Sequence, residues 1–224
     1  MSILIEPKQL AAGLGRCTVI DLRSTQDYDT AHIQGAVSLP ADFNAGAAPF
    51  KTTVGYPDPV SWAAALGGCG VCNDSVIVAY DDGDSGRAAA RFWFVARQYG
   101  HRSGVYILNG GFDAAAKYLP ITTDAPRIVP AIYTPIETPG NLLDLNDILP
   151  NFDRLIFLDV RSYEEYIGTD LRNNPRGGHI RGAILLDMKN FFADAPGQSF
   201  ASPKKLEQTM TQLGIRKTDY LVTY

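Results

Sequence analysis

The residues best suited to carry out chemistry form a short motif that occurs twice. Each copy has an Asp and an Arg two positions apart, then a Tyr, then a His before Ile-x-Gly. The pairs are Asp21 with Asp159, Arg23 with Arg161, Tyr28 with Tyr166, His32 with His179, and Gly35 with Gly182. An Asp–Arg pair could bind an anion and a His could act as a general base. We favour structural roles for both, because ion pairs and hydrogen-bonded turns are commoner than binding sites.

The cysteines offer a second kind of chemistry. The chain has three, Cys17, Cys69 and Cys72, and none after position 72. Cys69 and Cys72 have the spacing of a redox pair or half a zinc site, but no second pair and no flanking His accompany them. We therefore predict free thiols and no metal, with a redox pair as the alternative. The odd number and the absence of a signal-like N-terminus predict a reducing, cytoplasmic location.

An internal repeat must position these residues. Residues 70–80 align with residues 214–224 at an offset of 144, whereas the motif above has an offset of 138 at its Asp and 147 at its His. Blocks that agree in order predict two copies of one unit. Five prolines between Pro120 and Gly140 indicate an extended linker. The predicted domains are residues 1–119 and 141–224, joined by a linker over 120–140.

Apolar runs alternate with helical patterns in the first copy. We predict strands near 17–22, 36–39, 75–80 and 104–108, and helices near 7–14, 59–67, 86–99 and 111–117, with Gly110-Gly111 as a tight turn. This alternation is typical of an α/β fold whose mostly parallel sheet carries helices on both faces. Chemistry then belongs in the loops after the carboxyl ends of strands, which places it after Tyr80 and after Tyr224.

The second copy has no counterpart to the elements that follow Tyr80 in the first. We therefore expect the second domain to be incomplete, with Leu221 and Val222 beside an unpaired strand edge. Such an edge would favour self-association; a disordered second half, or a separate piece of the same protein that fills the gap, are the alternatives.

Charge and composition exclude several classes of partner. The chain has 20 basic and 24 acidic side chains, a net charge of −4. This balance argues against a nucleic-acid surface. No run of 18 apolar residues exists, so the sequence predicts no membrane span.

These motifs resemble the tandem-domain rhodanese family of sulfurtransferases over nearly the whole chain. The signatures are Asp-x-Arg-Ser near Glu-Tyr, Gly-His-Ile-x-Gly-Ala, and the strand ending Val-Thr-Tyr. The resemblance implies transfer of a sulfane sulfur from thiosulfate or 3-mercaptopyruvate to a thiol or cyanide acceptor, through a cysteine persulfide and without a cofactor. It also implies an inactive first domain, in which Asp81 replaces the reactive cysteine, and a catalytic cysteine directly after Tyr224. The 224-residue chain itself is then predicted to be inactive.

The resemblance also suggests how the donor binds. Arg172 and Arg176 are the candidate donor-binding residues, with Lys189 nearby, and Arg172 falls near an arginine that mercaptopyruvate-using members employ. Those members tend to have an Arg where this chain has Glu165, which leaves thiosulfate slightly favoured. In the first copy, Asp81, Asp82 and Asp84 should repel an anionic donor.

Two other functions fit parts of the sequence. One is a non-catalytic rhodanese module that binds a partner or a sulfur carrier. The other is a relative of the dual-specificity phosphatases, which share this fold but need a longer phosphate loop between a Cys and an Arg. The duplication with an Asp-bearing first copy favours the sulfurtransferase.

Overall fold

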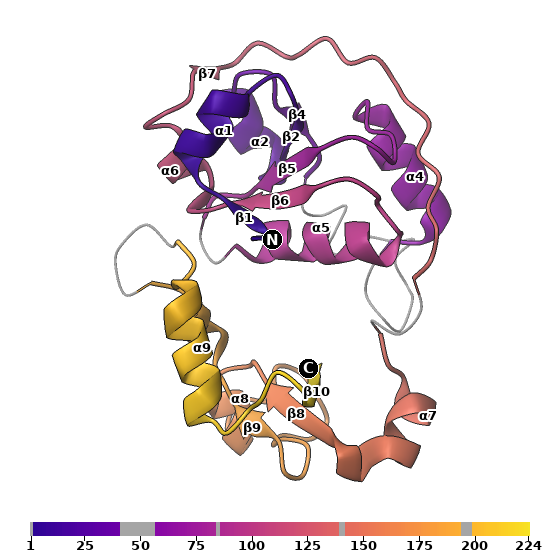
Figure 1. Ribbon diagram of the computed structural model, residues 1–224, viewed down its shortest axis with the longest axis vertical. Coiled ribbons are helices and arrows are strands. Elements are labelled where there is room, and N and C mark those ends of the chain that lie inside the picture. Colours follow the sequence, from indigo (N-terminus) through magenta and orange to yellow (C-terminus); the bar gives the residue numbers. More distant parts are fainter. Residues whose placement is uncertain (1, 41–56, 84–85, 139–141, 194–198) are drawn as a thin grey trace. The chain divides into compact units, whose positions relative to one another are not determined.

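The chain forms two compact units, which divide between Asn141 and Leu142 (Figure 1). The computed structural model describes residues 2–40, 57–83, 86–138, 142–193 and 199–224. The expectation about Asp84 therefore lies outside the described residues.

The first unit is built on a five-stranded sheet in which all neighbouring strands are parallel. In spatial order the strands are β1 (Leu4–Ile5), β6 (Val105–Leu108), β5 (Ile77–Tyr80), β2 (Thr18–Asp21) and β4 (Val37–Ser38). A separate antiparallel pair joins β3 (His32–Ile33) to β7 (Ile121–Thr122). The four predicted strands are confirmed. The sequence missed β1, β3 and β7, which have two residues each and are too short to show periodicity.

Helices cover both faces of this sheet. They are α1 (Pro7–Gly13), α2 (Thr25–Thr30), α4 (Pro59–Gly68), α5 (Arg87–Gln98) and α6 (Gly111–Ala115). Val78 and Tyr80 pack with Leu10 of α1 and Ala115 of α6. Alternate residues of β5 point to the opposite face, and α5 packs along β5 and β6. The predicted α/β fold with helices on both faces is confirmed for this unit.

The segment predicted as a linker is held against the first unit over residues 120–138. The amides of Ala131 and Thr138 donate to the carbonyls of Gly67 and Gln98, at 2.9 and 2.8 Å. The Asn73 side chain donates to the carbonyl of Thr134 and accepts from its amide. An extended, proline-rich segment has no internal backbone bonds; here its free amides and carbonyls bond to the α/β unit instead.

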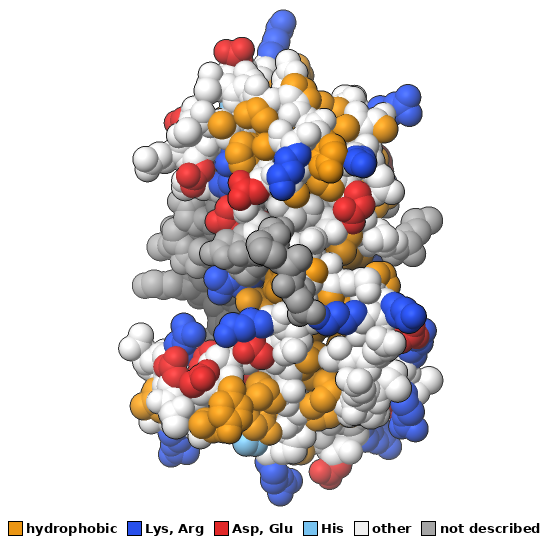
Figure 2. Space-filling view, turned by 90° about the vertical axis from the view of Figure 1, so that its left-hand side faces the viewer, with side chains coloured by type: hydrophobic (Ala, Val, Ile, Leu, Met, Phe, Trp, Pro, Cys, Tyr) orange, Lys and Arg blue, Asp and Glu red, His pale blue; other side chains and the backbone are white. Residues whose placement is uncertain are grey.

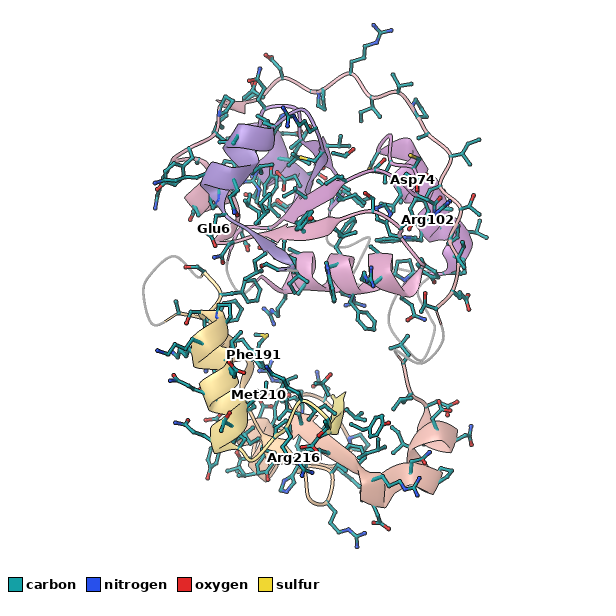
Figure 3. All side chains as sticks on the ribbon, viewed as in Figure 1. Glu6, Asp74, Arg102, Phe191, Met210 and Arg216 are labelled. Carbon is teal, nitrogen blue, oxygen red and sulfur yellow. The ribbon has the colours of Figure 1, made fainter. Side chains whose placement is uncertain are left out.

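The second unit repeats the order of elements around a smaller parallel sheet. Its strands, in spatial order, are β10 (Tyr220–Thr223), β8 (Leu155–Asp159) and β9 (Ile184–Leu185). Its helices are α7 (Leu145–Ile148), η1 (Leu149–Arg154), α8 (Tyr163–Ile167), η2 (Met188–Phe191) and α9 (Pro203–Gln212). Leu158, Leu186 and Ile215 form its core, and Phe191 and Met210 pack against it (Figure 3).

The strands β5 and β10, which correspond in the two copies, have different environments. In the first unit β5 lies in mid-sheet and all its residues are buried. In the second unit β10 is an edge strand among the described residues, with Tyr220 76% and Leu221 40% exposed. The expected exposure of Leu221 is confirmed, whereas Val222 is half-buried.

The surface carries both signs of charge. On the face that Figure 2 shows, Lys and Arg side chains alternate with Asp and Glu on each unit, and no single-sign face is visible. In the part of the chain that the structure describes, no helix has the length and apolar character that a membrane span requires.

The exposed edge of β10 predicts self-association. We expect the chain to form dimers or larger species as its concentration rises, and Leu221→Lys to reduce this, because a charge on an edge strand disfavours pairing with another chain. Sedimentation velocity over a concentration series measures both. Ile132→Lys is the matched control, since Ile132 is 85% exposed but lies outside any strand. A parent chain that stays monomeric throughout the series would contradict this prediction.

Candidate functional site

A buried ionic cluster marks the carboxyl ends of β2 and β5. Asp21 is fully buried and accepts hydrogen bonds from Arg23, at 2.7 Å from Nη2 and 3.0 Å from Nε. The Tyr80 hydroxyl donates to the same carboxylate at 2.5 Å. Arg23 Nη2 also donates to the carbonyl of Ala31 at 2.6 Å. Because every charged group has partners, the cluster is a structural element and no anion site.

Local geometry explains why Asp-x-Arg forms this cluster. The β2–β5 register places Asp21 opposite Tyr80. The chain turns directly after the strand, and the amide of Arg23 donates back to Asp21 at 2.9 Å. The Arg23 guanidinium also lies 3.7 Å from the centroid of the Phe112 ring, a favourable cation–π contact.

The two histidines have the structural role that their motif suggests. The ring of His32 stacks on Tyr28, with centroids 3.8 Å apart and an angle of 6° between the planes. Its Nδ1 lies 2.8 Å from the carbonyl of Tyr28, and its Nε2 lies 3.2 Å from the carbonyl of Asp124. His179 stacks on Tyr166 at 3.7 Å and makes the equivalent 2.8 Å bond.

The second unit repeats the ionic cluster in a more open form. Arg161 donates to Asp159 at 2.6 and 2.9 Å and to the carbonyl of Gly178 at 2.9 Å. Tyr224 takes the place of Tyr80, and its hydroxyl accepts from the amide of Ile180 at 3.0 Å. The Arg161 side chain is 29% exposed, against 7% for Arg23. Burial raises the pKa of both tyrosines, so both hydroxyls stay protonated.

The loop after Tyr80 contains an anion cradle that its own first residue fills. Asp81 is 6% exposed, and its carboxylate accepts from the amides of Gly83 and Ala89, both at 3.1 Å. Ala89 lies in the first turn of α5, where backbone N–H groups have no partner within the helix. The N-cap of α5 is Gly86, which has no side chain to supply a cap. Asp81 therefore caps the helix from upstream, and burial raises the pKa of its carboxyl.

Close contact between glycines fixes this loop. A Cβ on Gly83 would lie 2.8 Å from the carbonyl of Gly110, and a Cβ on Gly111 would lie 2.5 Å from the amide of Gly83. The amide of Phe112 donates to the carbonyl of Asp81 at 2.9 Å. Gly110-Gly111 is thus the predicted tight turn into α6, and it also holds the Asp81 loop in place.

The acidic loop differs in detail from the expectation. The Asp81 carboxylate faces the cradle instead of solvent, whereas Asp82 is exposed. The Asp81 carboxylate therefore occupies the backbone cradle itself.

None of the three cysteines lies in this loop. Cys69 is buried, and burial raises its pKa to about 11. Burial also raises the pKa of Cys17. Cys72 is exposed, and a hydrogen bond with Ser75 lowers its pKa. Cys72 precedes β5, so it lies at the opposite end of that strand from Asp81. Among the described residues, no group of three His, Cys, Asp or Glu side chains is placed to hold a metal.

Arg172 has acidic partners that the sequence analysis did not foresee. It lies 2.9 Å from Asp170 and 3.6 Å from Glu165. The contact needs a left-handed turn, with φ of 43° at Arg172 and 67° at Asn173, which sequence spacing does not reveal. Arg176 is exposed in the same segment, and Lys189 lies 3.9 Å from Asp187.

Known proteins share both this sequence pattern and this fold. Residues 6–117 match the family described as Rhodanese-like domain. A probable 3-mercaptopyruvate sulfurtransferase of Pseudomonas aeruginosa is 31% identical, over 99% of this chain and 83% of that protein. The chain belongs to the rhodanese family. The thiosulfate sulfurtransferase of Bos taurus is 30% identical to this rhodanese chain, over 75% of the chain and 59% of the bovine protein.

A solved structure extends the likeness to the whole fold. The 3-mercaptopyruvate sulfotransferase SseA from Escherichia coli superposes with a TM-score of 0.84 and 20% identity, covering 100% of this chain and 88% of that one. The bovine and rat thiosulfate sulfurtransferases are longer, and this chain covers 59% and 60% of their lengths.

The ionic cluster generates a stability prediction. We expect Tyr80→Phe to destabilise the first unit by ~1–3 kcal/mol, because it leaves the buried Asp21 carboxylate short of one donor. Urea unfolding followed by tryptophan fluorescence measures this, since both tryptophans, Trp62 and Trp93, lie in the first unit. Tyr118→Phe is the control: Tyr118 is 50% exposed, and its change should stay within about 0.5 kcal/mol. Equal effects of the two changes would contradict the role given to the Tyr80 hydroxyl.

Proposed function

We propose that this protein is a sulfurtransferase that moves a sulfane sulfur from a small anionic donor to a thiol or cyanide acceptor. The first unit would be inactive, and the second would carry the reactive cysteine directly after Tyr224. The observation that supports this most is the Asp81 carboxylate in the backbone cradle at the start of α5. The backbone N–H groups of this loop can bind an anion, and in the first unit the Asp81 carboxylate accepts their hydrogen bonds. The cluster of Asp159, Arg161 and Tyr224 would present the equivalent loop of the second unit.

The proposed chemistry is a double displacement. A thiolate attacks the outer sulfur of thiosulfate, the sulfur–sulfur bond breaks, and sulfite leaves with the bonding electrons. The cysteine persulfide then yields its terminal sulfur to cyanide, which becomes thiocyanate, and the thiolate is regenerated. Backbone N–H groups at a helix N-terminus lower the pKa of such a thiolate and stabilise the negative charge at each stage.

Arg172 and Arg176 are the proposed donor-binding residues. An Arg binds a carboxylate through two parallel N–H bonds, but Glu165 and Asp170 already contact Arg172. Any anionic donor that binds Arg172 must displace these groups. We propose thiosulfate as the slightly favoured donor, because the family members that use 3-mercaptopyruvate tend to have an Arg where this chain has Glu165.

A relative supports a second candidate, a rhodanese module that passes sulfur between proteins or only binds a partner. The sulfur carrier protein TtuD of Thermus thermophilus is 29% identical, over 88% of this chain and 72% of that protein. In this case the acceptor would be a protein thiol instead of a small molecule. The cytoplasmic location remains a prediction from cysteine usage.

A thiocyanate assay with thiosulfate and cyanide tests the proposed function. We expect the 224-residue chain to show no turnover, because Cys17, Cys69 and Cys72 all lie away from a strand-end loop. The same protein extended by its encoded residues should turn over, and a persulfide should appear on the cysteine after Tyr224. Turnover by the 224-residue chain that survives Cys69→Ser/Cys72→Ser would contradict the assignment of the site to the second unit.

The role of Asp81 can be tested separately. We expect Asp81→Cys, in the 224-residue chain with Cys17, Cys69 and Cys72 changed to Ser, to form no persulfide from thiosulfate at neutral pH. The side chain at this position is 6% exposed, so the donor has little access, and the remaining Asp82 disfavours a thiolate. Intact-mass analysis shows whether sulfur has been added. A persulfide on the introduced thiol would mean that the first unit lacks only the cysteine.

Glu165 gives a prediction about the donor. In the active, extended protein, Glu165→Gln should raise kcat/KM for 3-mercaptopyruvate relative to thiosulfate by roughly twofold to fivefold, the range expected for removing one partly exposed charge. The Gln oxygen can still accept the 3.3 Å bond from the amide of Ser162, so the cap of α8 is kept. Glu164→Gln is the matched control, since that side chain is exposed. An unchanged ratio would remove Glu165 from donor selection.

A further inference from the structure

The first unit has a cavity along the C-terminal half of α5. It is a cavity of about 570 Å³ whose walls combine two aromatic rings, two arginines and a histidine. The lining residues are Trp93, Phe94, Arg97, Gly100, His101, Arg102 and Thr138. Asp81 caps the N-terminus of α5, whereas this cavity surrounds its C-terminus. The lining residues of α5 begin at Trp93, about 9 Å along the helix axis from Arg87, and none of them contacts the cradle at Asp81.

The walls of the cavity are held in place by backbone contacts. The amide of Thr138 donates to the carbonyl of Gln98 at 2.8 Å, and the amide of His101 donates to the carbonyl of Ala96 at 3.0 Å. Gly100 has a φ of +63°, and a Cβ there would lie 2.7 Å from the carbonyl of Ile136. These contacts fix the end of α5 against residues 136–138. The cavity is therefore largely formed in advance, as small-molecule sites usually are.

The charged groups in the lining are all basic. Arg97 and Arg102 are both exposed, and among the residues that the structure describes no Asp or Glu lines the cavity. Arg102 has an acidic neighbour in Asp74, at 3.7 Å (Figure 3). Both side chains of that pair are mostly exposed, 62% and 74%, so the pair is weak and Arg102 can turn to another anion. Arg97, in the last turn of α5, also offsets the negative end of the helix dipole.

The histidine in the lining, His101, has an unsatisfied acceptor. It is 2% exposed, and its Nε2 lies 2.7 Å from the carbonyl of Ser75, so Nε2 carries the proton. Its Nδ1 then presents a lone pair, and this buried atom has no hydrogen-bond partner. Buried polar atoms are rarely left without one. Because this atom is itself buried, it belongs to the protein interior and does not contribute a contact to the cavity.

We propose that this cavity binds a small ligand that combines a flat aromatic ring with an anionic group. The ring would pack against Trp93 and Phe94, and Arg97 and Arg102 would bind the negative charge. The volume falls in the range of small-molecule sites, ~300–1,000 Å³. A nucleoside monophosphate and an aromatic carboxylate share this chemistry, and the experiment below distinguishes them.

Fluorescence of Trp93 gives a direct readout, since the only other tryptophan, Trp62, is fully buried. The 224-residue chain is titrated with AMP and with 4-hydroxybenzoate, and then with adenosine and inorganic phosphate, which carry only the ring or only the charge. We expect saturable quenching by AMP, by 4-hydroxybenzoate or by both, and at least about tenfold weaker binding of adenosine and phosphate, because each lacks one half of the recognised group. Whichever of AMP and 4-hydroxybenzoate binds more tightly shows whether the ligand is a nucleoside monophosphate or an aromatic carboxylate.

Two variants make the test specific. Arg97→Gln/Arg102→Gln should weaken binding by about tenfold or more, since charge-assisted bonds are lost, whereas Arg16→Gln/Arg127→Gln, exposed arginines of the same unit outside the lining, should leave it unchanged. Trp93→Phe should abolish the quenching while calorimetry still detects binding. The proposal is overturned if neither complete probe saturates, if adenosine binds as tightly as AMP, or if both arginine pairs have the same effect.

Discussion

The buried contact between Asp21, Arg23 and Tyr80 is the constraint on which the rest of the first unit depends. Burying a carboxylate and a guanidinium costs several kcal/mol unless both are well paired and hydrogen-bonded. Here the arginine bonds both carboxylate oxygens and the carbonyl of Ala31, and the tyrosine hydroxyl completes the set. These bonds tie the end of β2 to the end of α2 and to the end of β5. They therefore fix the point from which the Asp81 loop departs.

The second unit has the same contacts with less burial. Arg161 is the counterpart of Arg23 but is 29% exposed, and His179 is exposed where His32 is fully buried. Hydrogen bonds from Arg161 outweigh the effect of burial on Asp159, and the pKa of that carboxyl falls below its usual value. The geometry at Tyr224 is thus maintained by the pairing of β10 with β8 and by bonds to Gly178 and Ile180, and it does not require the fully enclosed core of the first unit.

Part of this arrangement could be predicted from the sequence, because the interacting residues lie close together along the chain. Asp-x-Arg at a strand end and the His before Ile-x-Gly contact residues close in sequence, so their type and spacing carry the information. The offsets between the copies also agree with the sheet registers, in which Asp21 lies opposite Ser38 and Asp159 lies opposite Leu185. The direction of the Asp81 side chain was not predictable. It depends on the N-cap residue Gly86, which has no side chain to cap the helix, and on contact with Gly111, 30 positions away. The pairing of Arg172 with Glu165 was missed for the same kind of reason, since it needs a left-handed turn at a non-glycine residue.

The Asp81 loop serves the stability of α5. The backbone N–H groups at the start of α5 need an acceptor, and Gly86 provides none. Any anion in the cradle satisfies them, and a carboxylate does so without being a good nucleophile toward sulfur. In the first unit the anion is therefore a permanent helix cap, enclosed by Gly83, Gly110 and Gly111. A thiolate in an equivalent cradle would meet the same physical need, but it would have to remain accessible in order to react. On this proposal, a structural copy and a catalytic copy would have similar N–H donors in the cradle. They would differ in which anion the donors hold and in how completely the loop encloses that anion.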